Sequence, residues 1–242
     1  MTSWDPHTKA SKAIASATRI GGRALLGLEA DKVARAYGIR VVKSALARSE
    51  KEAAFVAKDL GFPLALKVVS SDILHKSDVG GVKQGVDSVK GVKAAYAEIL
   101  SNVRRARPNA TVEGVLVQRM APEGHEFVVG ATRDQQFGPA VMFGLGGVYV
   151  ELFRDVSFRL APLTKKEALD MIDETRASRL LAGFRGSPPL DAGEVAETLV
   201  AVGKLITDLP EIDSVDVNPL FVYPKGVLAV DVRMILKKAV PS

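Results

Sequence analysis

The chain has 242 residues, of which 47% are hydrophobic and 25% charged, and this balance is typical of a globular protein with a substantial core. No apolar run is long enough to span a bilayer, and the absence of cysteine excludes disulfides and thiolate metal sites and fits a reducing cytoplasm. The net charge of +5 equals the excess of nine Lys/Arg over four Asp/Glu within residues 1–50. Because basic and aromatic side chains do not interleave there, nucleic-acid binding has little support.

The first half of the chain predicts an N-terminal arm followed by an α+β lobe. Residues 1–24 are rich in Ser, Ala and basic groups, and we interpret them as an arm that contacts a partner or is disordered, with a short helix over 10–20. Apolar spacing then predicts helices over 28–37, 50–60 and 88–106 and strands over 39–45, 64–69, 82–86 and 112–120. The order strand, helix, strand, strand, helix, strand predicts a first lobe over 25–120.

The sequence Ala-Pro-Glu-Gly at 121–124 predicts a hinge to a second lobe over 121–242. Strands are expected over 126–133, 139–143, 156–160, 214–222 and 227–232, the last two as a hairpin. Capping-box patterns begin helices at Ser49 in the first lobe and at Thr164 and Asp191 in the second.

Lys67 interrupts the otherwise apolar and β-branched strand Leu64–Val69. A buried strand has little reason to carry an ammonium group unless the charge meets an anion, which favours a contact to a nucleotide phosphate. The alternative is a lysine whose stem lies on the strand surface while its charge reaches water. This residue by itself leaves both interpretations open.

The loop after that strand holds His75, one of three histidines, and closes on Gly80 and Gly81. Glycine lets backbone come close to a ligand, and an imidazole can act as a nucleophile toward phosphorus. We therefore expect phosphate chemistry, although a lone histidine is more often structural or on the surface. Zinc is not expected, because cysteine is absent and no second histidine is near.

Three oxygen-bearing side chains are expected close together on the last hairpin. Asp216 and Asn218 are two residues apart and share one face of a strand, and Asp231 lies on the paired strand. Mg²⁺ prefers oxygen ligands and is usually held by one or two protein groups plus phosphate oxygens. Turn chemistry is the alternative, but the flanking residues have the character of buried strand. The pattern favours a magnesium site.

A second glycine-rich segment, Gly-Leu-Gly-Gly, lies at 144–147. It is not a Walker A loop, because no Gly-Lys-Ser/Thr follows, and it is not a dinucleotide fingerprint. A nucleotide site must therefore use another architecture, and a plain turn remains the alternative for this segment.

Several motifs together resemble a known family. They are Leu66-Lys67, the run Leu-His-Lys-Ser-Asp-Val-Gly-Gly-Val at 74–82, Gly144-x-Gly146-Gly147-x-x-Val150-Glu151, and Asp216-Val217-Asn218-Pro219-Leu220. Over roughly residues 25–236 the chain resembles the ATP-grasp domain of ADP-forming (NDP-forming) acyl-CoA synthetases, acetyl-CoA synthetases among them. The His-Lys-Ser-Asp loop is the specific part, whereas the Asp-x-Asn-Pro-Leu hairpin is shared with succinyl-CoA synthetase β subunits. The resemblance implies an α+β, ATP-grasp fold with two lobes that grip a nucleotide.

The resemblance also implies a role for each matching residue. His75 would be phosphorylated, and Asp216 would steady its imidazole. Phosphate contacts would come from Lys67 and Lys76, and the phosphate loops from Gly80, Gly81, Gly146, Gly147 and Glu151. The adenine-facing linker would include Gln118, Met120 and Ala121, the ribose ligand would be Glu126, and the Mg²⁺ ligands would be Asn218 and Asp231.

By resemblance, the chain would pass phosphate between His75 and ADP in the reversible conversion of acyl-CoA, ADP and phosphate to acid, ATP and CoA. The loop over residues 70–79 would then move to carry the phosphoryl group between sites on two subunits. A separate CoA-binding α subunit would carry the remaining chemistry, in an α2β2 heterotetramer. Two alternatives remain. One is another ATP-grasp ligase, such as a carboxylate–amine ligase or a succinyl-CoA synthetase relative, and the His75 loop disfavours the carboxylate–amine ligase. The other is a non-catalytic nucleotide-binding regulatory subunit, which the intact lysine and metal ligands disfavour.

Overall fold

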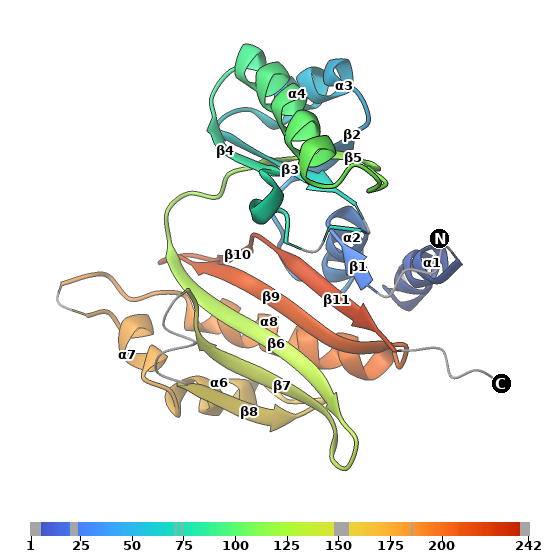
Figure 1. Ribbon diagram of the computed structural model, residues 1–242. Coiled ribbons are helices and arrows are strands. Elements are labelled where there is room, and N and C mark those ends of the chain that lie inside the picture. The colour runs from blue at the N-terminus through green and yellow to red at the C-terminus, as the bar shows by residue number, and fades with distance from the viewer. Residues whose placement is uncertain are drawn as a thin grey trace, which may run out of the picture. The chain divides into compact units, whose positions relative to one another are not determined.

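The computed structural model describes residues 6–19, 24–70, 72–73, 75–147, 155–184 and 186–237. Contacts group the chain into two compact units, Val42–Pro122 and the combination of Met1–Val41 with Glu123–Ser242. Each unit has its own β-sheet (Figure 1). Within the described ranges, no helix is long and apolar enough to cross a membrane.

The smaller unit is a four-stranded antiparallel sheet with two long helices. Its elements are β2 (Ser44–Ala47), α3 (Glu50–Leu60), β3 (Leu64–Val69), the 3₁₀ helix η1 (Ser77–Val79), β4 (Val82–Val86), α4 (Val89–Ala106) and β5 (Gly114–Arg119). The strand order is β2-β5-β3-β4. The predicted succession of strands and helices is confirmed. The strand expected over 39–45 forms only from Ser44, because Val41 instead forms a parallel bridge to Ala229 in the larger unit.

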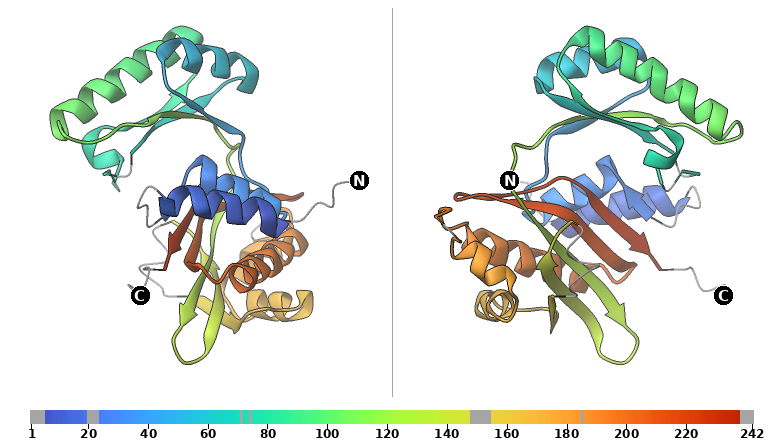
Figure 2. Two further views of the ribbon diagram at one scale, coloured as in Figure 1. Left: turned by 90° about the vertical axis from the view of Figure 1, so that its right-hand side faces the viewer. Right: turned by 60° about the vertical axis from the view of Figure 1, so that its left-hand side comes forward.

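Both helices of the smaller unit cover the same face of its sheet (Figure 2). Alternation along β3 turns Leu64, Leu66 and Val68 toward these helices, where they are buried in one core. Lys67 lies between them in sequence, so its side chain projects from the opposite face of the sheet. The capping box expected at Ser49 is only half present, because the Glu52 carboxylate accepts the N–H of residue 48 instead of the N–H of Ser49.

The larger unit is built around a seven-stranded antiparallel sheet. Its elements are α1 (Pro6–Arg19), β1 (Ala24–Leu26), α2 (Leu28–Ala36), β6 (His125–Asp134), β7 (Gly138–Leu145), β8 (Val156–Leu160), α6 (Lys165–Asp173), α7 (Ala177–Leu181), α8 (Ala192–Asp208), β9 (Ile212–Val222), β10 (Val227–Ala229) and β11 (Val232–Leu236). The order is β1-β11-β9-β6-β7-β8, with β10 also paired to β9. The strand expected over 227–232 is therefore two strands, and the five-residue α7 was not predicted.

Helix α8 lies along one face of this sheet, against β6, β7 and β9 (Figure 1). Four of its apolar residues are fully buried, namely Val195, Leu199, Val202 and Ile206. On β9, Val215 and Val217 are also buried, whereas Asp216 and Asn218 alternate with them and are exposed. The two polar residues therefore share the face opposite α8. The capping box predicted at Thr164 is complete and begins α6.

The described N-terminal residues belong to the larger unit. Leu25 is fully buried and pairs with Met234, so that β1 forms the edge of the large sheet beside β11. Helix α1 packs on α2 and β1 and buries Ala10 and Ile14. The observed division therefore differs from the expected arm over 1–24 and first lobe over 25–120, because the smaller unit begins only at Val42. The second boundary falls within the hinge expected at 121–124.

Candidate functional site

Strands β3 and β5 carry part of the predicted site in the smaller unit. The antiparallel register places Lys67 opposite Leu116, so Lys67 and Gln118, which lies two residues farther along β5, share the sheet face opposite α3 and α4. Among the described residues, no carboxylate forms an ion pair with Lys67. On the helix face, by contrast, Lys83 pairs with Glu98 at 2.7 Å between Nζ and Oε1. Lys67 as a residue is half-buried, and without such a partner its ammonium is available to an anionic ligand.

The end of β5 carries the residues expected to contact adenine. Gln118 is only 3% exposed. The N–H of Met120 donates to the carbonyl oxygen of Pro63 at 3.1 Å, and the Met120 Sδ accepts the N–H of Gly85 at 3.1 Å. Ala121 follows directly and is half-buried. The backbone is therefore held in place up to the point where the chain leaves the smaller unit.

The loop that carries His75 is anchored where it begins. Ser70 is buried, and its Oγ accepts the N–H of Asp72 at 3.2 Å. One carboxylate oxygen of Asp72 in turn accepts the N–H of Thr111 at 2.7 Å, which ties the loop to the segment before β5. Ile73 is 3% exposed and belongs to the hydrophobic core of the unit. The first part of the loop is thus packed against the unit.

Two glycines anchor the end of the same loop. Gly80 has a φ of 63°, and its carbonyl oxygen accepts the side-chain N–H of Asn102 on α4 at 3.3 Å. The N–H of Gly81 donates to the carbonyl oxygen of Lys76 at 2.8 Å, and a Cβ on Gly81 would lie 2.6 Å from Cγ1 of Val68. At these glycines the loop backbone packs closely against β3 and α4. We had expected it to come close to a ligand instead.

His75 lies between these anchors and is exposed. Within the part of the chain that the structure describes, no hydrogen bond or ion pair holds its imidazole. Lys76 is half-buried beside it. Residues 71 and 74 of the loop lie outside the described residues. An exposed imidazole on a loop with two fixed ends is chemically accessible and locally positioned.

The proposed metal ligands come together on one side of the large sheet. The N–H of Asn218 donates to the carbonyl oxygen of Asp231 at 3.1 Å, which makes the two residues direct neighbours. Asp231 lies in the break between β10 and β11. Asp216 is two residues before Asn218 and lies opposite Arg233 in the register of β9 and β11. The neighbourhood expected from the hairpin is therefore present.

Although Asp216 lies on the exposed face of β9, its surroundings partly remove the carboxyl from water, which raises the pKa of this carboxyl above its ordinary value. The nearby Arg233 guanidinium opposes this shift, whereas the Asp231 carboxylate adds to it. Sequence reasoning missed Arg233 as a member of the site. Its position two residues after Asp231, at strand spacing, was the signal that could have placed both on one face.

The donor set suits Mg²⁺ shared with phosphates more than a metal enclosed by protein. Within the described residues, no group of three or more His, Cys, Asp or Glu side chains is arranged to hold a metal ion. Mg²⁺ commonly takes one or two protein ligands when phosphate oxygens and water complete its coordination shell. The amide oxygen of Asn218 and the carboxylate of Asp231 could supply these two ligands.

The second glycine-rich segment packs against the residue expected to bind ribose. The N–H of Gly146 donates to the carbonyl oxygen of Glu126 at 2.9 Å, and a Cβ on Gly146 would lie 2.9 Å from the Glu126 carbonyl carbon. Gly147 has a φ of 65°, and a Cβ there would lie 3.1 Å from the Glu126 carboxylate. The structure thus brings these three predicted residues together. Glu151 lies outside the described residues.

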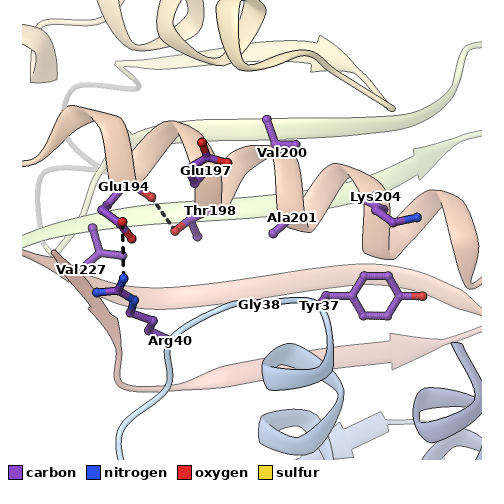
Figure 3. A pocket seen from close by; sticks show the side chains of 10 residues that line it. All are labelled: Tyr37, Gly38, Arg40, Glu194, Glu197, Thr198, Val200, Ala201, Lys204 and Val227. Carbon is purple, nitrogen blue, oxygen red and sulfur yellow. Dashed lines mark hydrogen bonds and ion pairs between the residues drawn. The ribbon is translucent and has the colours of Figure 1, made fainter. Parts of the chain in front are cut away.

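A groove of about 260 Å³ between the end of α2 and α8 contains none of the predicted site residues (Figure 3). Its charged groups already have partners of opposite sign. Arg40 pairs with Glu194 at 3.4 Å, and Lys204 pairs with Asp208 at 2.7 Å. The groove therefore has no unpaired cation for a phosphate, and it is separate from the candidate nucleotide residues of the larger unit.

The family model of the ATP-grasp domain matches residues 16–236, and the chain therefore belongs to the ATP-grasp family. The β subunit of acetate–CoA ligase (ADP-forming) I from Pyrococcus furiosus is 47% identical over 88% of this chain and 92% of its own length. Within the ATP-grasp family, the chain accordingly falls in the branch of the ADP-forming acetate–CoA ligases. The predicted resemblance and fold are confirmed.

Two further comparisons bear on the extent of the match. The acetate–CoA ligase (ADP-forming) I of Archaeoglobus fulgidus is 48% identical over 96% of this chain, but the chain spans only 34% of that protein. A structure of acetyl-coenzyme A synthetase 1 from Ca. Korarchaeum cryptofilum has a TM-score of 0.84 and 44% identity over 94% of this chain and all of the compared chain. It holds coenzyme A and Mg-AMPPCP, and its phosphohistidine segment points towards the nucleotide-binding site.

Proposed function

We propose that this chain is the nucleotide-binding subunit of an ADP-forming acetyl- or acyl-CoA synthetase and passes a phosphoryl group between His75 and ADP. One observation carries the proposal. His75 is exposed on a loop anchored at both ends, in a chain that is 47% identical to an acetate–CoA ligase β subunit along nearly the whole length of that subunit. A nucleophilic imidazole held at a fixed place is suited to covalent phosphoryl transfer.

In the direction of ATP synthesis, the phosphorus–nitrogen bond of phosphorylated His75 breaks while a β-phosphate oxygen of ADP bonds to phosphorus. The ring nitrogen keeps the electron pair of the broken bond. The ring leaves as neutral imidazole if its other nitrogen carries a proton. We assign to Asp216 the task of holding that proton in place by accepting a hydrogen bond from the N–H.

The remaining proposed residues bind and orient the nucleotide. Lys67 and Lys76 would hold its phosphates, and the glycine-rich segments would pass close to them. The linker from Gln118 through Met120 to Ala121 would contact adenine, and Glu126 would accept hydrogen bonds from the ribose hydroxyls. Bound by Asn218, Asp231 and phosphate oxygens, Mg²⁺ would neutralise phosphate charge.

A CoA-binding α subunit is the proposed partner, in an α2β2 assembly. This division of labour is supported by the two kinds of relative, since the chain spans 92% of a β subunit but only 34% of an Archaeoglobus fulgidus ligase. The remainder of that longer protein is the length in which CoA-binding and acyl-transfer chemistry would lie. We also propose a cytoplasmic location, which fits the lack of cysteine in the sequence.

The proposal is tested by reconstitution. Purified chain mixed with acetyl-CoA, ADP, phosphate and Mg²⁺ should form no ATP, and addition of a CoA-binding α subunit from an ADP-forming acetyl-CoA synthetase should start ATP formation. Succinyl-CoA in place of acetyl-CoA tests the succinyl-CoA synthetase alternative. Turnover by the chain alone, or nucleotide binding without turnover with any such partner, would contradict the assignment.

A further inference from the structure

The hydrogen bonds at the two ends of the His75 loop carry an inference that rests on the proposed function. At one end, the Asp72 carboxylate accepts the Thr111 N–H at 2.7 Å. At the other, the Asn102 side chain donates to the Gly80 carbonyl oxygen at 3.3 Å. Neither Asp72 nor Asn102 belongs to a nucleotide-binding motif.

We propose that Asn102 and Asp72 are positioning residues that hold the His75 loop against the smaller unit, in the conformation that exchanges phosphate with the nucleotide. The loop continues directly from β3, the strand that carries Lys67. The anchored loop and the proposed phosphate-binding lysine therefore belong to the same compact unit. Holding the loop there limits how far in space the imidazole can move from that lysine.

Packing explains why both ends must be held by specific contacts. Ile73 inserts into the core near one end of the loop, and Val79 packs against the same core near the other. Two residues of chain span at most about 7 Å, so the Cα of His75 stays within about 7 Å of the Cα of Ile73 while that residue is buried. The anchored loop is therefore a short arm, and travel beyond this range requires release of Ile73 and its neighbouring bonds.

Gly80 shows why Asn102 in particular holds the end of the loop. A Cβ at residue 80 would lie 2.8 Å from Nδ2 of Asn102 and 3.2 Å from its Cβ and Cγ. The side chain thus packs on the backbone of residue 80 as well as bonding to its carbonyl. The left-handed φ of 63° and this contact together require glycine at the position.

The test uses Asn102→Asp, which keeps the shape of the side chain but replaces the donor NH₂ by an acceptor. Asn109→Asp makes the same chemical change at an exposed residue that forms no hydrogen bond to the described residues of the loop, and it serves as the matched control. Asp72→Ala tests the other end. Two quantities are measured in the full-length chain, namely the rate of acid-labile ³²P incorporation from γ-³²P-ATP and the affinity for Mg-ATP.

Asn102→Asp and Asp72→Ala should each slow ³²P incorporation about fivefold, the effect of losing one hydrogen bond that holds the reactive conformation. The affinity for Mg-ATP should stay within about twofold, since the nucleotide residues are untouched. Amide hydrogen exchange at residues 76–81 should accelerate by a similar factor, without change in β3 or α4. Asn109→Asp should match the wild type in all three measurements.

Three results would overturn the inference. They are an unchanged rate of labelling in both loop variants, a loss of Mg-ATP affinity as large as the loss of rate, or equal effects in Asn109→Asp. If the wild-type chain takes up no ³²P, the proposed function itself fails and the inferred role fails with it. Hydrogen exchange would then report only whether the two side chains fix the loop.

Discussion

Replacing Lys67 with methionine removes one positive charge and keeps most of the stem. Lys67 is half-buried and has no carboxylate partner within the described residues, so its loss breaks no ion pair in the protein. If the ammonium bonds a phosphate of ADP, the charge-assisted bond is worth about 1.5–3 kcal/mol, and the Kd for Mg-ADP should rise about 10- to 150-fold. The free energy of unfolding should change by less than about 1 kcal/mol.

Lys83→Met is the matched control, because Lys83 is the neighbouring strand lysine on the opposite face. Its ion pair with Glu98 joins side chains that are 40% and 51% exposed. Loss of such a pair costs about 0–1 kcal/mol of stability and should leave ADP affinity unchanged. Isothermal titration calorimetry measures the Kd and urea unfolding measures stability. An unchanged Kd in Lys67→Met, or an equal rise in both variants, would refute the phosphate contact and return Lys67 to the solvent-reaching interpretation.

Four further variants test the larger unit. Asn218→Ala and Asp231→Ala should each raise, by about tenfold or more, the Mg²⁺ concentration at which phosphoryl transfer is half-saturated, without unfolding the chain. Normal phosphoryl transfer by either variant at limiting Mg²⁺ would remove the metal assignment. Because the pKa of the Asp216 carboxyl is raised in the folded chain, its ionisation at higher pH disfavours folding. Asp216→Asn should therefore raise the melting temperature at pH 7–8 while lowering His75 phosphorylation, and the gain in stability should vanish toward about pH 4. A lower melting temperature of this variant at pH 8 would contradict the direction of the pKa shift. Arg133→Met should cost about 2–4 kcal/mol of stability, measured by urea unfolding, because the guanidinium donates to three carbonyl oxygens at the end of α8 and the start of β9; a loss below 1 kcal/mol would contradict that role.

Local patterns in the sequence were sufficient to predict the strands that carry the candidate site. The mostly apolar run Leu64–Val69 lies between a proline and a polar loop, and its observed bounds are the predicted ones. The two-residue spacing of Asp216 and Asn218 likewise predicted that they share a strand face, because side chains alternate along any strand. These features depend on neighbours in sequence, which a single chain displays directly.

Features set by distant pairing could not be predicted in this way. Leu25 pairs with Met234, more than 200 residues away, and this pairing places the start of the chain in the larger unit. Asn102 reaches Gly80 because α4 packs beside the loop, and nothing in the helical pattern of α4 marks that side chain. Each depends on tertiary packing, whereas apolar spacing reports only which face of an element is buried.

Phosphorylation of His75 is the central claim, and its most direct measurement is acid-labile ³²P incorporation from γ-³²P-ATP followed by a chase with unlabelled ADP. The wild-type chain should become labelled in a form stable to base and labile to acid, and ADP should remove the label as ³²P-ATP. His75→Ala should bind Mg-ATP with unchanged affinity and take up no label. Acid-labile label retained in His75→Ala, or label in the wild type that ADP does not remove, would contradict the mechanism.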